Sequence, residues 1–503
     1  MTHWIIVPVV LPAVLGALIV LAMRNDLLLQ RVFGLAGTVA LTGVALALFR
    51  AASLNPPEVY LLGNWPAPFG IVLMLDRLAA LLVLLTMVLA LFVQLYAIGT
   101  GWDAKGRHFH ALFLFQLMGL SGAFLTGDLF NLFVFFEVLL IASYGLMIHG
   151  GGKDRLRAGV QYVAFNLVGS TLFLFALATI YSVTGTLNMA DLAVKVAVLP
   201  QGDTALLRVG AMLLLLVFAI KGALVPLQFW LPGTYAAAPG PVAALFAVMT
   251  KVGAYAVIRV YTLIFPPTAP AIGPMTGDVL LPAALVTLVI GAIGVMGAGT
   301  LPRLVAFAAI ASMGTLFTAV ALFTPQGTAA ALYYLLHSTF ATAILFLLAD
   351  LVLSRRGAGT LRQALPPVAQ SGLLAALFFA GAIALAGMPP LSGFIGKLLI
   401  LQAARDHIAT VWPVILATSL LMILGFAAAG STLFWKAHAS PRPLGPEPPA
   451  PAALPFVAVF GLLACLVGLT GFAGPVMLTL NATAAGLYMP APYIAANTLP
   501  AQD

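Results

Sequence analysis

The chain has 503 residues, of which 62% are hydrophobic and only 7% are charged, and its formal net charge is +8. Because soluble proteins carry about 25% charged residues, this composition excludes a water-soluble globular fold. Apolar runs recur from end to end, and many reach the roughly 20 residues that cross a bilayer as a helix. These runs do not alternate in polarity as the strands of a membrane β-barrel do, so strands are not expected. The sequence predicts an all-α polytopic membrane protein.

About fourteen transmembrane helices are predicted along the chain. The first apolar run is too long for a cleaved signal peptide and lacks a clear small-residue cleavage site, so it is interpreted as a span. A Pro-rich segment, 437–453, is expected to be an extended linker. The polar tail, 481–503, is expected to lie loosely outside the bilayer. The predicted spans are 4–23, 31–49, 78–98, 109–126, 129–148, 158–184, 207–231, 241–264, 279–299, 303–323, 328–353, 371–402, 411–435 and 454–480.

The basic residues of the loops are distributed unevenly between the two sides of this arrangement. Loops after even-numbered spans hold Arg50, Arg77, Lys195, Arg208 and Arg405, whereas those after odd-numbered spans hold many more. Because positively charged loops stay in the cytoplasm, both termini are predicted on the outer face. The net positive charge is explained by this bias, without a nucleic-acid partner. The basic residues after odd-numbered spans are Arg24, Arg31, Lys105, Arg107, Lys153, Arg155, Arg157, Arg303, Arg355, Arg356, Arg362, Lys436 and Arg442.

The cysteine and histidine content argues against redox cofactors. The single cysteine, Cys465, lies in an apolar span, which excludes a disulfide framework, a four-cysteine zinc site and a cysteine-ligated iron–sulfur cluster within the chain. No pair of histidines has a spacing that suggests haem ligation. No cofactor or metal is therefore expected, and the chain is not expected to carry electrons.

Four ionisable residues lie inside apolar spans: Glu137, Lys221, Lys251 and Lys397. A charge at the bilayer centre costs roughly 2.5–3.5 kcal/mol on insertion scales, so such residues face a bundle interior, a partner or water. Two structural readings compete with a functional one. The lysines could extend their side chains to the headgroups, or Glu137 could form a structural ion pair. With three lysines and one carboxylate, however, two ammonium groups would remain unpaired.

Buried lysines without a partner suit proton transfer. Burial disfavours the charged form of a lysine, so its proton can be released near neutral pH, and a nearby carboxylate holds the proton on. Lysine is a poor ligand for Na⁺, which prefers oxygen donors. The row is therefore interpreted as a path for protons rather than for metal ions.

Polar residues at helical spacing accompany this row. Lys251, Tyr255 and Arg259 stand at i, i+4 and i+8 on one helix face. His337 has Tyr333 and Tyr334 close by on its helix and can titrate near neutral pH, although a structural interhelical hydrogen bond is an equal alternative. The sixth span carries a similar stripe, formed by Tyr162, Asn166 and Ser170.

Prolines interrupt two of the apolar spans. Pro226 in "KGALVPLQFW" and the pair Pro389–Pro390 in "AGMPPLSGFIGK" fall inside segments that continue past them. Proline breaks or kinks a helix, and breaks near the membrane midplane mark ion sites in transporters. One such proline would be an ordinary kink. Two in similar surroundings, five spans apart, indicate a five-helix repeat, spans 4–8 and 9–13, which must be inverted because its helix number is odd.

Five segments, in order, resemble the antiporter-like subunits that complex I shares with the multisubunit Mrp-type (Mnh/Pha) Na⁺/H⁺ antiporters, and the D subunits of these antiporters in particular. The resemblance covers about residues 70–430. It implies fourteen helices with inverted repeats and broken seventh and twelfth spans. It also implies an N-terminal segment (1–108), two antiporter-like repeats (109–264 and 279–435), a C-terminal helix (454–480) and a tail. The segments are "FVFFEVLLIASYGLM", "KGALVPLQFWLPGTYAAAPGPVAALFAVMTKVGAYAVIRV", "LPRLVAFAAIASMG", "YYLLHSTFATAILFLLADL" and "GMPPLSGFIGKLLIL".

The resemblance also implies roles for individual residues. Glu137 would pair with Lys221, Lys251 would relay the proton, His337 would link the two halves, and Lys397 would end the path. Two positions depart from the pattern common in complex I, where a histidine replaces Gln228 and a lysine replaces Ala341. Both departures favour the Mrp side. They also leave His337, the hydroxyls of Tyr333 and Tyr334, or water to connect the halves.

The function expected from these features is proton translocation within a hetero-oligomeric cation/proton antiporter of the bacterial inner membrane. Partner subunits would handle Na⁺ or K⁺, so the chain is expected to be a secondary transporter subunit rather than an enzyme. The alternative is the proton-pumping membrane subunit of a complex I-like NADH–quinone oxidoreductase or a membrane-bound hydrogenase. A stand-alone exchanger ranks last, because it would need several mid-membrane carboxylates and only Glu137 is there.

Overall fold

The computed structural model describes residues 2–199, 204–440 and 453–498, and nineteen α-helices make up most of them. Ten of these helices are long and apolar enough to cross a membrane, and four more are apolar but shorter. The chain is therefore an all-helical membrane protein in its spanning part. The first half comprises α1 Val7–Ala22, α2 Leu27–Leu54, α3 Arg77–Thr100, α4 Phe109–Leu125, α5 Leu129–Met147, α6 Lys153–Thr184, α7 Met189–Val198, α8 Ala205–Lys221, α9 Trp230–Ala237 and α10 Gly240–Leu263. The second half comprises α11 Met275–Gly297, α12 Leu301–Val320, α13 Pro325–Arg356, α14 Ser371–Ala386, α15 Ser392–Ala403, α16 Ile408–Gly430, α17 Ala453–Gly471, α18 Ala473–Leu487 and α19 Ala491–Thr498.

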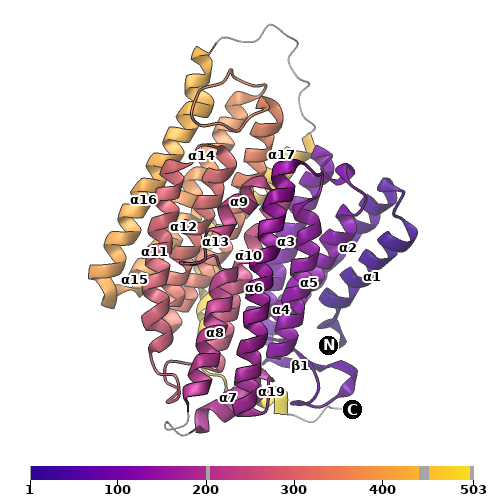
Figure 1. The fold of residues 1–503 in the computed structure, drawn as a ribbon, viewed down its shortest axis with the longest axis vertical. Helices are drawn as coiled ribbons and strands as arrows, with labels where there is room; N and C mark the ends of the chain where they lie inside the picture. The colour runs from indigo at the N-terminus through magenta and orange to yellow at the C-terminus, as the bar shows by residue number, and fades with distance from the viewer. Residues whose placement is uncertain (1, 200–203, 441–452, 499–503) are drawn as a thin grey trace.

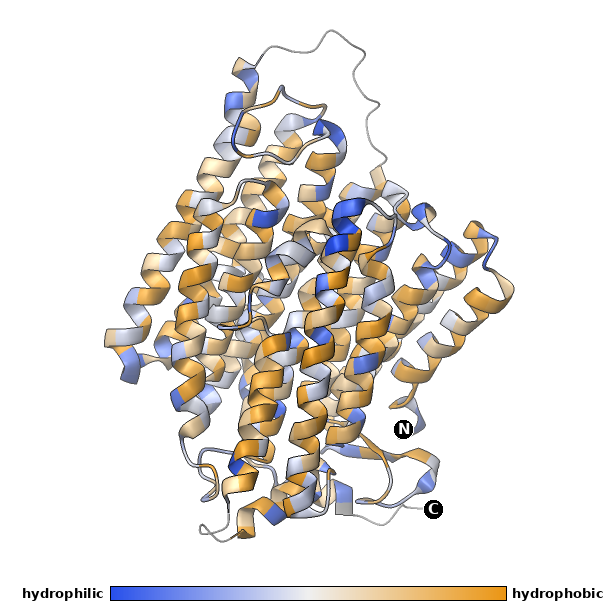
Figure 2. Cartoon of the chain, viewed as in Figure 1, coloured by the Kyte–Doolittle hydropathy of each residue, from blue (hydrophilic) through white to orange (hydrophobic). Residues whose placement is uncertain are grey.

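The long helices run roughly side by side along the longest axis of the molecule, with α1 and α2 at one side and α16 at the other (Figure 1). Helix α10 is the centre of the bundle, since every one of its residues is buried. Hydrophobic residues dominate the body of the bundle, and hydrophilic residues gather towards its two ends (Figure 2). The start of α1 and helix α19 lie at the same end (Figure 1).

Aspartates and glycines set the limits of several helices. Asp26, Asp76 and Asp128 precede α2, α3 and α5, and each carboxylate accepts a hydrogen bond from a backbone N–H three residues later. At the other end, Gly185 and Gly357 close α6 and α13 in the left-handed conformation, with φ of 69° and 68°. These local signals fix where the long apolar runs turn.

A small β-hairpin lies in the connection between α2 and α3. Strands β1 (Glu58–Leu61) and β2 (Val72–Leu75) pair antiparallel, with Glu58 opposite Leu75. The expectation that the chain has no strands is wrong at this point. That expectation concerned the spans, whereas the hairpin lies in a connection between them, and all four residues of β2 are buried against the helices.

The described part of the C-terminal tail is helical, so the expectation of a loose tail is wrong there. Helix α18 continues the last predicted span to Leu487, and α19 follows it. Tyr493 is 6% exposed, and Asn497 Nδ2 donates to Asn188 Oδ1 at 2.6 Å. Ala484 and Leu487 on α18 are also buried. Most of the predicted Pro-rich linker, with Arg442, lies outside the described residues.

Two helices are interrupted in the middle of apolar segments. Helix α8 ends at Lys221 and α9 begins at Trp230, with Pro226 between them. The second interruption, which contains Pro389 and Pro390, separates α14 from α15. Backbone groups freed at such a break need new partners in a membrane. At the first break the Ile220 carbonyl accepts from Trp230 Nε1 at 3.1 Å.

Candidate functional site: a row of ionisable side chains inside the bundle

Lys221, the last residue of α8, lies at the first break and is 8% exposed. Its ammonium donates a hydrogen bond to Asn166 Oδ1 on α6 at 2.9 Å. The Asn166 amide is oriented by its own donation to the Tyr162 carbonyl at 2.8 Å. The ammonium group is therefore held by a neutral amide and is not paired with a charge at hydrogen-bonding distance.

Glu137 on α5 is half-buried and accepts a hydrogen bond from the hydroxyl of Ser170 on α6. Within the part of the chain that the structure describes, no ion pair within 4 Å joins Glu137 to Lys221. Their two partners, Asn166 and Ser170, are four residues apart on α6, so they lie about 6 Å from each other on one face. The carboxylate and the ammonium are thus neighbours across one helical turn, connected by two neutral polar side chains.

A small cavity adjoins Lys221. Its volume, measured as the space open to the centre of a water molecule, is about 20 Å³. Tyr162, Asn166, Lys221, Trp230 and Tyr235 contribute to its lining. A polar site of this size can hold about one water molecule, which needs two to four polar partners. The cavity therefore offers a place for one mobile hydrogen-bonding molecule beside the lysine.

Lys251 lies in the middle of α10 and is 1% exposed. Its ammonium contacts the sulfur of Met313 on α12 at 3.3 Å. A thioether is a weak acceptor, so this ammonium has a poorer partner than Lys221 does. The side chain does not extend to the headgroups, and the alternative of a lysine reaching the membrane surface does not apply to it.

Lys397 on α15 lies at the second break and is 8% exposed. Its ammonium donates to the Ala386 carbonyl at 2.8 Å and to Ser419 Oγ on α16 at 2.7 Å. Ala386 is the last residue of α14, so the lysine satisfies a carbonyl that its own helix break sets free. This side chain, too, bends inwards rather than towards the headgroups.

His337 on α13 connects the middle of the bundle to the second break. Its Nδ1 shares a hydrogen bond of 2.9 Å with the hydroxyl of Ser392, the first residue of α15. The histidine is fully buried, and its other ring nitrogen, Nε2, faces Gly393 at the start of α15. A Cβ on Gly393 would lie 2.8 Å from that nitrogen and would collide with the Ala384 carbonyl oxygen. Only glycine therefore permits this close approach of the broken helix to the imidazole.

The polar residues predicted to support the row have their own partners. Tyr255 donates to the Phe124 carbonyl at 2.7 Å, and Tyr333 donates to the Leu469 carbonyl at 2.9 Å. The ring of Tyr334 packs against His337 with 5.5 Å between centroids. Arg259 forms two hydrogen bonds, of 2.6 and 2.7 Å, with the carboxylate of Asp76.

Sequence reasoning missed three of these partners: Asp76, Ser392 and Ser419. Asp76 could have been recognised as the cap of α3, but its pairing with a residue 183 positions away has no local signal. The stripe of Tyr162, Asn166 and Ser170 was visible from its spacing, and the structure directs Asn166 and Ser170 at the two charged groups. The described residues include no group of three or more His, Cys, Asp or Glu side chains arranged to hold a metal ion.

Taken together, a helical bundle with two interrupted helices and separate ionisable groups in its interior defines a membrane protein of the ion-translocating class. Residues 126–424 match the family described as NADH:quinone oxidoreductase/Mrp antiporter, TM. The chain belongs to this family, and within it to the group formed by the D subunits of the Mrp antiporters.

Individual relatives agree with this assignment. The chain is 39% identical to the D subunit of a probable K⁺/H⁺ antiporter from Rhizobium meliloti (strain 1021), over 97% of this chain and 96% of the relative. It is also 39% identical to the D subunit of the Na⁺/H⁺ antiporter from Bacillus subtilis (strain 168), over 93% and 94%. Among solved structures, a chain of the Mrp complex from Dietzia sp. DQ12-45-1b superposes with a TM-score of 0.90 at 28% identity, covering 99% of this chain and 100% of that one.

Proposed function

We propose that the chain is the proton-translocating subunit of a multisubunit Na⁺/H⁺ or K⁺/H⁺ antiporter. The observation that carries the proposal is the row of Glu137, Lys221, Lys251 and Lys397, in which three buried lysines and one half-buried carboxylate are held by neutral groups. Relatives named as the D subunits of Na⁺/H⁺ and K⁺/H⁺ antiporters support it over almost the whole chain.

The path begins at the first break. Glu137 favours the protonated form of Lys221 through its negative charge, while burial favours the neutral form. A small movement of α6, which carries both neutral partners, changes the balance and releases the proton. The water-sized cavity beside Lys221 is also lined by Met249 and Val252, which flank Lys251 on α10, so it lies on the way to the second lysine.

The second half of the path runs from Lys251 through His337 to Lys397. His337 shares a hydrogen bond with Ser392, at the start of the helix that bears Lys397. Complex I subunits commonly have a further lysine where this chain has Ala341. In this chain the His337 imidazole therefore takes the place of a titratable group between Lys251 and Lys397. Lys397 then returns the proton to the aqueous side near the second break.

The membrane arrangement that suits this path has fourteen spans in an inner bacterial membrane, with both termini outside. In this count α8–α9 and α14–α15 are the interrupted seventh and twelfth spans, and α17–α18 form the last one. Two inverted repeats, 109–264 and 279–435, follow the N-terminal segment 1–108. The other subunits of the complex provide the path for Na⁺ or K⁺, and this chain works as a transporter subunit without a redox centre.

A second candidate is the pump subunit of a redox complex, because the matching family includes NADH:quinone oxidoreductase. The partners of the chain distinguish the two. Purification from the native membrane should recover small membrane subunits without flavin or iron–sulfur absorbance. Recovery of flavin and iron–sulfur subunits would replace the antiporter proposal with the pump.

The direct test measures antiport in vesicles that contain the assembled complex. Lys221→Ala and Glu137→Ala are each expected to abolish cation-dependent proton movement, because each removes one of the two charged groups at the start of the path. The complex is expected to assemble in both variants. Lys195→Ala is the matched control, since Lys195 forms an exposed pair with Asp191 on α7. Activity at the control level in both variants would refute the proposal.

A further inference from the structure

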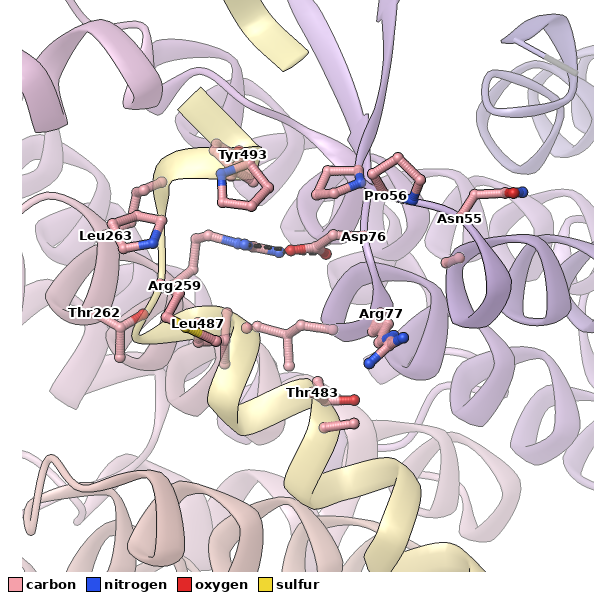
Figure 3. Close-up of a pocket in the computed structure, with 18 of the residues that line it drawn as sticks. Asn55, Pro56, Asp76, Arg77, Arg259, Thr262, Leu263, Thr483, Leu487 and Tyr493 are labelled. Atoms are coloured by element: carbon pink, nitrogen blue, oxygen red, sulfur yellow. Dashed lines mark hydrogen bonds and ion pairs between the residues drawn. The ribbon is translucent and has the colours of Figure 1, made fainter. Parts of the chain in front are cut away.

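A second, larger cavity lies at the end of the bundle that carries the start of α1 and helix α19. Its volume, measured in the same way as that of the small cavity, is about 350 Å³. It is enclosed by the end of α2, the start of α3, the end of α10 and the C-terminal α18–α19 (Figure 3). Much of its lining is apolar, including Leu78, Leu263 and Leu487, but one wall is charged.

Asp76 and Arg259 form the charged wall, and their side chains point at each other (Figure 3). Their side chains are 12% and 3% exposed. The Tyr493 hydroxyl, also in the cavity lining, is buried and has no hydrogen-bond partner within the described residues. Buried polar groups are normally satisfied by protein or by ordered water. A roomy cavity that has an ion pair and an unpartnered hydroxyl in its lining is therefore suited to hold water.

The pair is also the outer end of the stripe that leads to Lys251. Arg259 and Lys251 are eight residues apart on α10, so about 12 Å of helix separates them. Tyr255 lies between them, and its ring centroid is 5.7 Å from the Arg259 guanidinium carbon. Its hydroxyl lies on the same face and contacts the Phe124 carbonyl. The stripe thus joins the cavity to the central lysine, and the Tyr255 hydroxyl is the group in it that can pass a proton.

We propose that this cavity is a water-filled vestibule through which Lys251 exchanges protons with the face of the membrane that carries α19. The Asp76–Arg259 pair forms its inner end. This inference rests on the proposed function, and it adds a connection besides the one through Lys397. Arg77 also lines the cavity, so two guanidinium groups, which keep their protons, stand against the single carboxylate of Asp76 and leave a net positive charge there. A hydrated Na⁺ or K⁺ is repelled by that charge in a narrow passage, whereas a proton can pass along water and the Tyr255 hydroxyl.

Cysteine accessibility tests the vestibule, since the chain has a single cysteine that can first be removed as Cys465→Ala. Thr262→Cys places a thiol in the cavity lining, one turn beyond Arg259, at a side chain that is only 4% exposed. Pro66→Cys is the control, because it lies exposed in the loop of the β-hairpin. Right-side-out vesicles containing the assembled complex are treated with a membrane-impermeant sulfonate methanethiosulfonate reagent.

Both thiols should react, and antiport should fall at least ten-fold only in Thr262→Cys. An unreactive Thr262→Cys would overturn the vestibule, and so would a modified one with unchanged antiport. Lys221→Ala is measured in the same vesicles. If that variant keeps its antiport, the proposed function itself fails; if it is inactive while modified Thr262→Cys is active, only the vestibule fails.

The charge barrier has its own test. Arg77→Gln removes the net positive charge of the lining and leaves the Asp76–Arg259 pair in place. Passive uptake of Na⁺ into vesicles should rise several-fold in it, whereas Arg77→Lys, which keeps the charge, should match the unmodified complex. Equal Na⁺ uptake in all three would overturn the barrier.

Discussion

The molecule contains two sets of buried charges, and their partners differ in kind. Arg259 is bonded to Asp76 through both terminal nitrogens, and at the other end of the molecule Asp103 is bonded to Arg31 and His110. In the row of the candidate site, by contrast, each charged group contacts a hydroxyl, an amide, a carbonyl or a thioether. A paired charge keeps one protonation state, whereas a charge that only neutral groups hold can change its state at low cost.

The difference separates stability from transport. Removing one partner of a buried pair leaves an uncompensated charge and is strongly destabilising. Removing a buried charge that has no ionic partner leaves no such charge behind, and it can even stabilise the fold because a desolvation cost disappears. Variants in the row should therefore lose transport but not stability, and variants in the pairs should lose stability first.

Lys251→Met is expected to have the largest effect on transport. The apolar side chain fits beside Met313 and cannot carry a proton, so antiport should fall at least 100-fold. The thermal midpoint of the purified complex should stay the same or rise, since the buried ammonium is gone. Antiport is measured in vesicles, and the thermal midpoint is measured in detergent. Substantial antiport, or a thermal midpoint lowered as much as in a variant that breaks a buried ion pair, would contradict the distinction between the row and the pairs.

Asn166→Asp would give Lys221, a member of the row, an ionic partner in place of a neutral one. The new carboxylate replaces an amide oxygen that lies 2.9 Å from the Lys221 ammonium. An opposite charge at that distance favours the protonated lysine, so the proton is held and antiport should fall about ten-fold or more. Asn166→Ser, which keeps the partner of Lys221 neutral, is the control. Equal antiport in both variants would show that the neutrality of this partner is unimportant.

Asp103→Asn should mainly reduce stability. Asp103 is fully buried and accepts from Arg31 at 2.6 Å and from His110 at 3.1 Å. Loss of its charge should cost about 3 kcal/mol, as for other broken buried pairs, with antiport per folded complex unchanged. Asp191→Asn breaks an exposed pair with Lys195 and should cost less than about 1 kcal/mol. Chemical unfolding of the two variants side by side measures the difference.

The features of the molecule that depend on local signals in the chain could be predicted from the sequence. Pro226 and Pro389 act on their own helices, and the four ionisable residues are conspicuous in apolar runs, so the breaks and the members of the row were identified. Partners were not, because Asp76 meets Arg259 only when α3 and α10 pack together. The fold class followed from composition, but the β-hairpin and the docked tail did not, since both depend on tertiary burial of short segments.

The pair at Asp103 also predicts a dependence of stability on pH, the smallest of these effects. Asp103 lies between α3 and α4, outside the spans. Burial raises the pKa of its carboxyl, but the hydrogen bonds and charges of His110 and Arg31 outweigh burial and lower the pKa to about 2. In the unfolded chain the pKa is about 3.9. Because the folded value is the lower one, the carboxylate contributes stability that is fully present above about pH 4 and is lost as the pH falls through about 2.

The Asp103 carboxylate contributes about 2.6 kcal/mol at neutral pH. The thermal midpoint of the unmodified complex should therefore exceed that of Asp103→Asn at pH 6, and the gap should narrow between pH 4 and pH 2. Asp191→Asn, measured over the same range, accounts for the general effect of acid on the complex. A gap between the unmodified complex and Asp103→Asn that stays constant down to pH 2 would mean that the carboxylate contributes through its shape and hydrogen bonds rather than through its charge.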